Sequence, residues 1–389
     1  MKIAYVSKIN FPSKQTNALS IMKMCQAMHN DGHEVTLFAY RNRLRNYNES
    51  SLYRAYGIAG GFTIITVFVP QKLLFFKIFS MYYSYLAMRK IKKIKANLIY
   101  SRLANFELGM IKNDLPIIYE MHSLGPFVKS NKLRNHFIKL LYSKSFKRII
   151  VTTELIKASL TQIFQQLDLN VDIKVARLSA DYPITISDQA LDSFKKDNMI
   201  DSRKFNVGYT GVLKNVELRG IPLILEMAEK LPLVDFHIVG GDKEDLVGYD
   251  KYFELKNLIF HGYQQSDKIP YYLLCFNAVL SPLRSSANSL NPLGRNMSPL
   301  KISQYLAYSK VIIASNIPQH SEIIKNGENG ILVDESSVDE YVSTIEVLMK
   351  MEEDELKQLS SNALKTYNDS FTPNKRLAII FEGLERRGV

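Results

Sequence analysis

The chain alternates short apolar strand patterns with amphipathic helix patterns over most of its 389 residues. It opens with KIAYVS (2–7), continues with a helix pattern over 20–32, and then has a second strand pattern, HEVTLFAY (33–40). A strand, a helix and a strand in this order predict a parallel β-α-β unit. Further strand patterns begin at 62, 97, 116 and 148, so the first half predicts a doubly wound α/β domain.

A second series of the same kind follows a polar stretch at 180–204, where we expect the interdomain connection. Its predicted strands are 205–211, 234–241, 257–263, 278–283, 311–315 and 330–333, with helices at 221–231 and 298–309 and more helices after 338. The sequence therefore predicts an N-terminal domain (1–185), a C-terminal domain (205–370) and a final segment (371–389) that ends in a helix.

Length and composition agree with two soluble domains. The 389 residues suit two cores of roughly 150–200 residues each, and 46% hydrophobic with 23% charged residues is ordinary for globular proteins. Cys25 and Cys275 have apolar neighbours and no metal-ligand spacing, which favours buried thiols in a reducing compartment. Neither a signal-peptide pattern nor an apolar run of about 18 residues is present, so we expect a cytoplasmic protein.

The net charge of +12 predicts an anionic partner, which the charge alone leaves open between nucleic acid, anionic lipid and phosphorylated substrates. No nucleic-acid-binding module is recognisable, so we expect no nucleic acid partner. Residues 71–95 combine many Phe, Tyr and Leu residues with seven basic ones. This pattern fits a helix on an anionic membrane surface, or a core helix whose basic end complements its dipole.

The segment GYTGVLKNVELRG (208–220) places Thr210 and Gly211 directly after a predicted strand, with Lys214 and Arg219 before the next helix. Backbone N–H groups exposed by glycine, together with two cations, suit a diphosphate. The alternative is a tight turn with a solvated arginine near a helix start, where the helix dipole disfavours it.

A second phosphate candidate is SPLK (298–301). Ser298 is a good N-cap and a proline follows at the first helical position, so the N–H groups of Leu300 and Lys301 are free for an anion. An ordinary capped helix start explains the same residues.

His122 directly follows a predicted strand, where ligands bind in parallel sheets. The alternative is a structural or merely solvated histidine, as lone histidines most often are. Glu120 shares its face of the strand and is expected to orient the imidazole or to cap a turn.

Several functional classes lack their motifs. The chain has no GxGxxG after its first strand, no P-loop and no GxSxG, and its seven histidines lack zinc spacing. Asp242, Glu244 and Asp245 form a possible metal cluster but fit a solvated turn better. We therefore expect no metal and no other cofactor.

The order of MKIAYVS, QTNALSIMKMCQAM, YEMH, GYTG with RG, HIVGG, FHGY, SPLKISQYLAYSKVIIAS and GENGILV resembles the family 4 glycosyltransferases of the GT-B fold. The resemblance covers nearly the whole chain and is weakest at 41–95 and 123–145. It implies two Rossmann-like domains facing a central cleft and a retaining, metal-independent sugar transfer. The implied donor is a UDP-sugar or GDP-sugar bound mainly by the C-terminal domain. The implied acceptor, held by the N-terminal domain, is a glycan or a polyprenyl-diphosphate-linked glycan. The final helix, 376–387, resembles one that packs back across the first domain. Bacterial surface polysaccharide synthesis, of lipopolysaccharide O-antigen or capsule, at the inner face of the membrane follows as the expected role.

The same resemblance implies roles for individual residues. His122 matches a histidine near the donor sugar, and Arg219 matches a base on the diphosphate. A second base usually follows the glycine, where this chain has Val212, and Lys214 is the expected substitute. The remaining matches are Tyr263 and Gln264 at the nucleobase, residues 297–301 at the phosphates, and Gln15, Thr16 and Asn17 in the N-terminal loop.

Two family carboxylates are replaced by amides. The family commonly has two glutamates separated by seven residues, and this chain has Asn296 and Gln304 at those positions. Both amides keep hydrogen-bonding ability and lose charge, which predicts weaker or altered donor recognition. Two alternatives stay open: a nucleotide-sugar 2-epimerase, which shares the fold, and a degenerate, non-catalytic nucleotide-sugar-binding protein.

Overall fold

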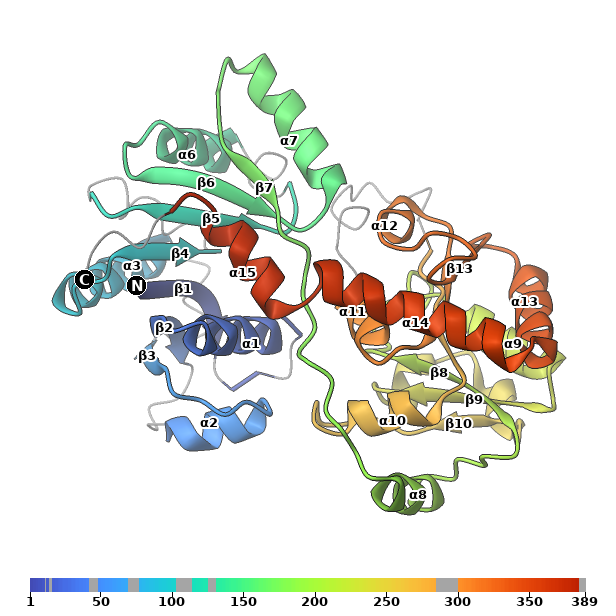
Figure 1. Ribbon diagram of the computed structural model, residues 1–389. Helices are drawn as coiled ribbons and strands as arrows, with labels where there is room; N and C mark the ends of the chain where they lie inside the picture. Colours follow the sequence, from blue (N-terminus) through green and yellow to red (C-terminus); the bar gives the residue numbers. More distant parts are fainter. Residues whose placement is uncertain are drawn as a thin grey trace. The chain divides into compact units, whose positions relative to one another are not determined.

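The computed structural model describes residues 1–10, 12–13, 16–41, 48–68, 77–102, 114–124, 131–284 and 300–384. The chain forms two compact units (Figure 1). The first unit contains residues 1–177 and 373–389, and the second contains residues 178–372. The polar stretch 180–204, expected as a connection, therefore belongs to the second unit, and its residues Asp188–Asp197 form helix α8.

The described part of the first unit holds a seven-stranded parallel sheet in the order β3-β2-β1-β4-β5-β6-β7. Its strands are β1 Lys2–Asn10, β2 Glu34–Arg41, β3 Thr63–Phe68, β4 Leu98–Ser101, β5 Ile117–Met121, β6 Phe146–Val151 and β7 Ile173–Val175. The order 3-2-1-4-5-6 is that of doubly wound nucleotide-binding folds, and it changes direction between β1 and β4.

Helices cover both faces of this sheet. Apolar side chains of α1 (Thr16–Asn30), α2 (Glu49–Ala55) and α15 (Pro373–Phe381) form the core on one face. Those of α3 (Lys77–Lys93), α6 (Asn131–Leu141) and α7 (Glu154–Gln166) form it on the other. The C-terminal helix α15 lies against α1 and β7 within this unit, whereas the expected helix began at 376 and ended at 387.

The second unit repeats the plan with six described parallel strands in the order β10-β9-β8-β11-β12-β13. These are β8 Phe205–Thr210, β9 Val234–Val239, β10 Leu258–Phe260, β11 Ala278–Ser281, β12 Val311–Ser315 and β13 Ile331–Val333. Counted from β8, the order is again 3-2-1-4-5-6, and the change of direction falls between β8 and β11.

The helices of the second unit also pack on two faces. Apolar residues of α9 (Ile221–Lys230) and α13 (Val338–Lys350) cover one face. Those of α10 (Ile269–Cys275), α11 (Leu300–Ala307) and α14 (Glu353–Ser370) cover the other. The short elements η3 Lys243–Leu246, η4 Asp250–Glu254 and α12 Pro318–Ser321 lie in connecting segments. The described part of the helix expected at 298–309 is α11.

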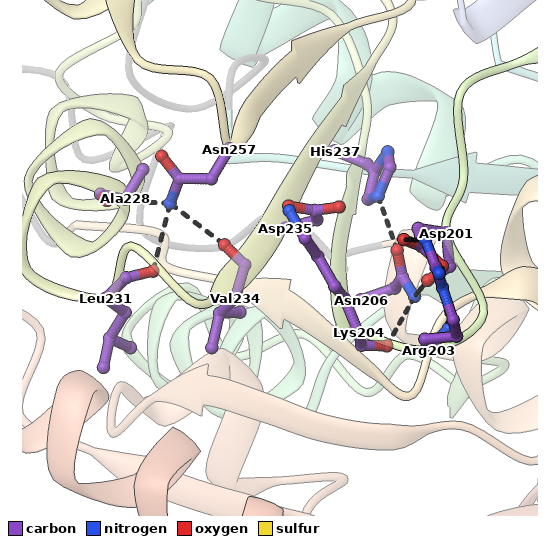
Figure 2. Close-up of polar contacts among 10 residues, drawn as sticks. All are labelled: Asp201, Arg203, Lys204, Asn206, Ala228, Leu231, Val234, Asp235, His237 and Asn257. Carbon is purple, nitrogen blue, oxygen red and sulfur yellow. Dashed lines mark hydrogen bonds and ion pairs between the residues drawn. The ribbon is translucent and has the colours of Figure 1, made fainter.

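Two buried asparagines hold the start of this second sheet (Figure 2). The Asn257 amide nitrogen donates to the carbonyls of Ala228, Leu231 and Val234 at 2.9–3.0 Å, which fixes the turn between α9 and β9. The Asn206 amide nitrogen donates to the carbonyls of Asp201 and Lys204, both at 2.9 Å. The amide nitrogen of Asn206 is thereby fixed, and its oxygen faces the buried His237.

A hydrogen-bonded chain continues from Asn206 across β9 to the end of β10. His237 Nε2 donates to Asn206 Oδ1 at 2.9 Å, so the uncharged ring must accept at Nδ1. That acceptor faces His261 Nε2 at 3.0 Å, and His261 is therefore the donor. Burial lowers the pKa of His261 to about 4, which keeps this ring uncharged at neutral pH.

None of the described helices has the length and apolar character needed to span a bilayer.

We expect His237 to make the free energy of unfolding rise with pH between about 4 and 6.5. Burial first, and then the charges of His261 and Lys204, lower its pKa to about 3 in the folded protein, against about 6.5 in an unfolded chain. The unfolded state binds more protons in this window, so stability present above pH 6.5 is lost as the pH falls towards 3. His237→Gln should lower the slope by about 1 kcal/mol per pH unit, measured by urea unfolding from pH 4 to 7. An unchanged slope in the folded variant would contradict this assignment.

Candidate functional site

A pocket of about 200 Å³ lies at the carboxyl ends of β1, β4 and β5, where the strand order of the first sheet changes direction. Its lining is mostly polar or charged and consists of Ser7, Lys8, Asn17, Ile21, Arg102, Tyr119, Glu120, Met121, His122 and Ser123. Ligands of parallel α/β sheets bind at such a point. The predicted residues Asn17 and His122 therefore lie together in this unit.

The buried carboxylate of Glu120 is the centre of this pocket's polar network. Its Oε1 contacts His122 Nε2 and lies 3.0 Å from Arg376 Nη2, while its Oε2 accepts a hydrogen bond from the Tyr100 hydroxyl. Arg102 Nε lies 3.9 Å from the same Oε1. Burial alone would raise the pKa of Glu120, but Arg376, Arg102 and His122 outweigh it and hold the pKa well below its usual range. Glu120 is therefore ionised at neutral pH.

The tautomer of His122 follows from these contacts. Burial and the charge of Arg102 lower its pKa to about 4, although Glu120 opposes this, so the ring is uncharged at neutral pH. Arg102 Nη2 lies 3.2 Å from His122 Nδ1, and a guanidinium can only donate. The ring proton therefore sits on Nε2 and is donated to Glu120. Glu120 does orient the imidazole, as one of its two predicted roles required, and both ring nitrogens are engaged within the protein.

In the second unit, Tyr305 brings helix α11 to the corresponding edge of the second sheet. Its buried hydroxyl accepts from the Thr210 N–H at 3.0 Å and from the Thr210 hydroxyl at 3.2 Å, and it donates to the Leu280 carbonyl at 3.3 Å. Because Thr210 ends β8 and Leu280 lies in β11, these bonds span the switch point. The start of α11, Leu300, is placed beside it.

The loop between β8 and α9 crosses the same switch point, and its two ends pass close to the backbone of other segments. Gly220 has φ +65°, and a Cβ there would lie 1.7 Å from the Pro282 carbonyl oxygen, just after β11. A Cβ on Gly240 would lie 2.3 Å from the Gly211 carbonyl oxygen. Both close approaches exclude a side chain. The loop therefore passes close along the strand ends, with Arg219 next to Gly220.

Lys301 and Arg219 form a pair of neighbouring cations at this edge. Lys301 Nζ lies 3.8 Å from the centre of the Tyr209 ring and 3.4 Å from where a Cβ on Gly211 would stand. Burial, and then the charge of Arg219, lower the pKa of Lys301 well below its usual range. Among the described residues neither cation forms an ion pair, and Arg219 Nε donates only to the Lys214 carbonyl at 2.9 Å. The nearby Glu217 faces Tyr249 and Arg284 instead.

The other predicted residues lie away from the centres of these two clusters or fall outside the described residues. The Lys214 side chain is exposed. Tyr263 is 51% exposed, and Gln264 Nε2 donates to the His261 carbonyl at 2.6 Å. Thr16 is the first residue of α1. Gln304 lies one turn after Lys301 on α11, and its side chain makes no hydrogen bond with the described residues. Gln15, Asn296 and Ser298 lie outside the described residues.

Several residues of these clusters, among them Arg102, Tyr305 and Arg376, were not among the predicted site residues. Arg102 directly follows β4, so the rule that ligands bind at strand ends could have identified it. Tyr305 and Arg376 gave no signal, because a buried tyrosine and a helical arginine are common in any α/β protein. No group of three or more His, Cys, Asp or Glu side chains in the described part of the chain is arranged to hold a metal ion.

Residues 192–366, all within the second unit, match a family model described as "Glycosyl transferases group 1". No curated protein sequence matches the chain.

Solved structures match over nearly the full length. HepE from Anabaena in complex with UDP has 16% identity, 99% coverage of both chains and a TM-score of 0.72, and HepE is also solved with UDP-glucose. A glycosyltransferase from Rickettsia africae ESF-5 has 15% identity, 99% coverage of both chains and a TM-score of 0.74. WaaG, a glycosyltransferase involved in lipopolysaccharide biosynthesis, has 12% identity, covers 98% of this chain and 100% of its own, and has a TM-score of 0.65. These likenesses confirm the predicted GT-B fold class with its two Rossmann-like units.

Proposed function

We propose that this chain is a glycosyltransferase that transfers a sugar from a nucleoside-diphosphate sugar to a glycan or lipid-linked acceptor. The observation that carries the proposal is the pair Arg219 and Lys301, two cations without an acidic partner among the described residues, beside Gly211 at the switch point of the second sheet. Two neighbouring cations in a partly buried site are costly unless an anion joins them. A diphosphate supplies that anion, and the family match over residues 192–366 supports a sugar nucleotide.

The chemistry of the proposed reaction needs positive charge at the leaving group. As the bond between the sugar's anomeric carbon and the diphosphate breaks, negative charge develops on the diphosphate oxygen. Arg219, Lys301 and the first N–H groups of α11 are the proposed stabilisers of that charge. The acceptor oxygen attacks on the same face, and its proton passes to the departing diphosphate. Configuration is thereby retained, and neither an enzymic nucleophile nor a metal ion is required in the proposed scheme.

We place the acceptor in the first unit, at the pocket that contains Arg102 and His122. Because both nitrogens of His122 are engaged, it serves this site as a neutral, fixed ring and not as an acid or base. HepE is solved with UDP-glucose and WaaG acts in lipopolysaccharide biosynthesis. They support a nucleotide-sugar donor and a place in the synthesis of a bacterial surface polysaccharide. The proposed membership of family 4 is supported by the sequence resemblance alone.

The proposal includes an anionic membrane surface as a partner of helix α3. The described residues 77–93 contain no acidic residue, while Met81, Tyr82 and Tyr85 are 49–60% exposed. The basic residues Arg89, Lys90, Lys92 and Lys93 follow on the last turns and are also exposed. Exposed aromatic rings beside cations suit the headgroup region of a bilayer. Residues 71–76 of the predicted segment 71–95 lie outside the described residues. We therefore propose a cytoplasmic enzyme that binds the inner face of the membrane.

The transferase proposal is tested by release of nucleoside diphosphate from a panel of UDP-sugars and GDP-sugars, with and without lipid extract. We expect release with one donor, increased by the extract that contains the acceptor. Interconversion of donor sugars without transfer would instead identify an epimerase. Tight nucleotide binding without release from any donor would identify a non-catalytic binding protein. Either result would refute the transferase.

Lys301→Met should weaken binding of the nucleoside diphosphate by roughly 10- to 100-fold, the worth of a hydrogen bond to a charged group. The bound anion should also raise the lowered pKa of Lys301 towards its ordinary value. Titration calorimetry measures the change in affinity. Lys256→Met is the matched control: it is an exposed lysine of the second unit outside both clusters, so it should change affinity less than about threefold. Equal losses in both variants would contradict the assignment of Lys301.

Replacing Lys90, Lys92 and Lys93 by glutamate should weaken binding to anionic vesicles by about 100-fold or more, because each basic residue near such a surface is worth about 1 kcal/mol. Vesicle sedimentation at low salt measures this. The control replaces the exposed Lys325, Lys357 and Lys365 of the second unit, which changes net charge equally and should leave binding nearly unchanged. Equal loss in both triple variants would show that only net charge matters, and α3 would not be the contact.

A further inference from the structure

We propose that Arg376, on the C-terminal helix α15, is a positioning residue that fixes the tautomer of His122 through the Glu120 carboxylate. Arg376 is 2% exposed, and its Nη2 lies 3.0 Å from Glu120 Oε1. Its other terminal nitrogen donates to the carbonyls of Ala176 and Arg177, just after β7. The two residues of this ion pair are 256 positions apart in the chain, and all these groups belong to the first unit.

Arg376 and His122 share one oxygen. Glu120 Oε1 receives both Arg376 Nη2 and His122 Nε2, whereas Oε2 accepts from Tyr100. The charge on the oxygen that holds His122 therefore depends directly on Arg376. A guanidinium whose other terminal nitrogen is bound to two carbonyls has little freedom to leave that oxygen.

The charged and titratable groups around Glu120 come from every element packed against it. They are Arg376 from α15, Arg102 after β4, His122 after β5, and the buried Tyr100 and Tyr5 from β4 and β1; Cys25 of α1 interacts with Tyr5. Lys8 of β1 lines the same pocket. Burial favours a protonated Glu120, and Arg376 is the largest effect in the opposite direction. Without the charge of Arg376, the pKa of Glu120 must rise.

A protonated Glu120 would reverse the hydrogen bond to His122. The carboxylic acid would donate to Nε2, and the single ring proton of the neutral imidazole would move to Nδ1. That N–H would then face Arg102 Nη2, which can only donate. Two opposed donors cannot keep a 3.2 Å contact, so His122, Arg102 or both would leave their present positions. The C-terminal helix thus supplies a charge that sets the geometry of the pocket.

The tautomer is measured directly by NMR of the full-length protein with ¹⁵N-labelled histidine, where His122→Gln identifies the His122 signals. In the native protein His122 should carry its proton on Nε2 from pH 5 to 8. Arg376→Gln removes the charge but keeps an N–H donor for the neighbouring carbonyls. In this variant we expect an Nδ1-protonated form whose population grows as the pH is lowered from 8 to 5. Arg376→Lys restores a positive charge and should restore the native pattern.

Arg148→Gln is the matched control for loss of helix anchoring. Arg148 donates to the Ile380 carbonyl of α15 at 3.2 Å and pairs with Asp172 at 2.8 Å, but it does not contact Glu120. This variant should leave the His122 tautomer native. A native His122 pattern in a folded Arg376→Gln protein from pH 5 to 8 would overturn the proposal, as would the same change in Arg148→Gln. If Arg376→Gln does not fold, Arg376→Lys tests the proposal instead. An Nδ1-protonated His122 at pH 7 in Arg376→Lys would contradict the proposal.

The role of this positioning in catalysis rests on the proposed function, and a kinetic readout tests that part separately. Arg376→Gln should lose nucleoside-diphosphate release more strongly at pH 5.5 than at pH 8, and Arg376→Lys should recover most of it. A loss that is equal at all pH values would overturn the positioning role. If the native protein releases nucleoside diphosphate from no donor, the transferase proposal fails, while the NMR result still decides the inference about Arg376.

Discussion

Parallel pairing of the strands in both described sheets is the constraint from which the rest of the structure follows. Parallel neighbours need a crossover connection, which here is usually a helix. The carboxyl ends of all strands of a sheet therefore lie at one edge, and the next helices begin there. In the order 3-2-1-4-5-6 the chain reverses its direction across the sheet between β1 and β4, and again between β8 and β11. Both candidate clusters lie at these two points. Their residues are distant in sequence, yet the topology alone brings them together.

The two clusters differ in whether their buried charges have partners of opposite sign. In the first unit the Glu120 carboxylate lies between two arginines and accepts from Tyr100 and His122, so its burial is compensated by contacts within the protein. In the second unit Lys301 and Arg219 are neighbours without a carboxylate among the described residues. Burial first, and then the charge of Arg219, lower the pKa of Lys301, so its charged form is unfavourable there without an anion. Binding an anion would relieve this unfavourable charge at the Lys301 and Arg219 cluster, which favours anion affinity. The compensated charges around Glu120 instead fix the geometry of their side chains.

The sequence predicted the sheets well because most of the buried strands are rich in apolar residues. It missed β7, whose three residues are only half-buried, and α8, which has no buried residue, because both lack an apolar pattern. At the site, the strand-end rule identified His122, Thr210 and Arg219. It could not assign Arg376, whose importance depends on a contact between residues 256 positions apart. Lys301 was predicted for its backbone N–H, and only the packing of its side chain on Tyr209 reveals a second cation.

The neutral amide of Gln304 affects the charge of the neighbouring Lys301. Residues three apart on a helix are neighbours, so Lys301 and Gln304 lie one turn apart on α11. A glutamate at 304 would pair with Lys301, raise its pKa and compete with a bound diphosphate for its charge. The neutral amide leaves that charge available and still offers hydrogen bonds. Under the proposed function, the amide at 304 therefore keeps the positive charge of Lys301 available for the phosphates, at the cost of a weaker hydrogen bond to a sugar or ribose hydroxyl.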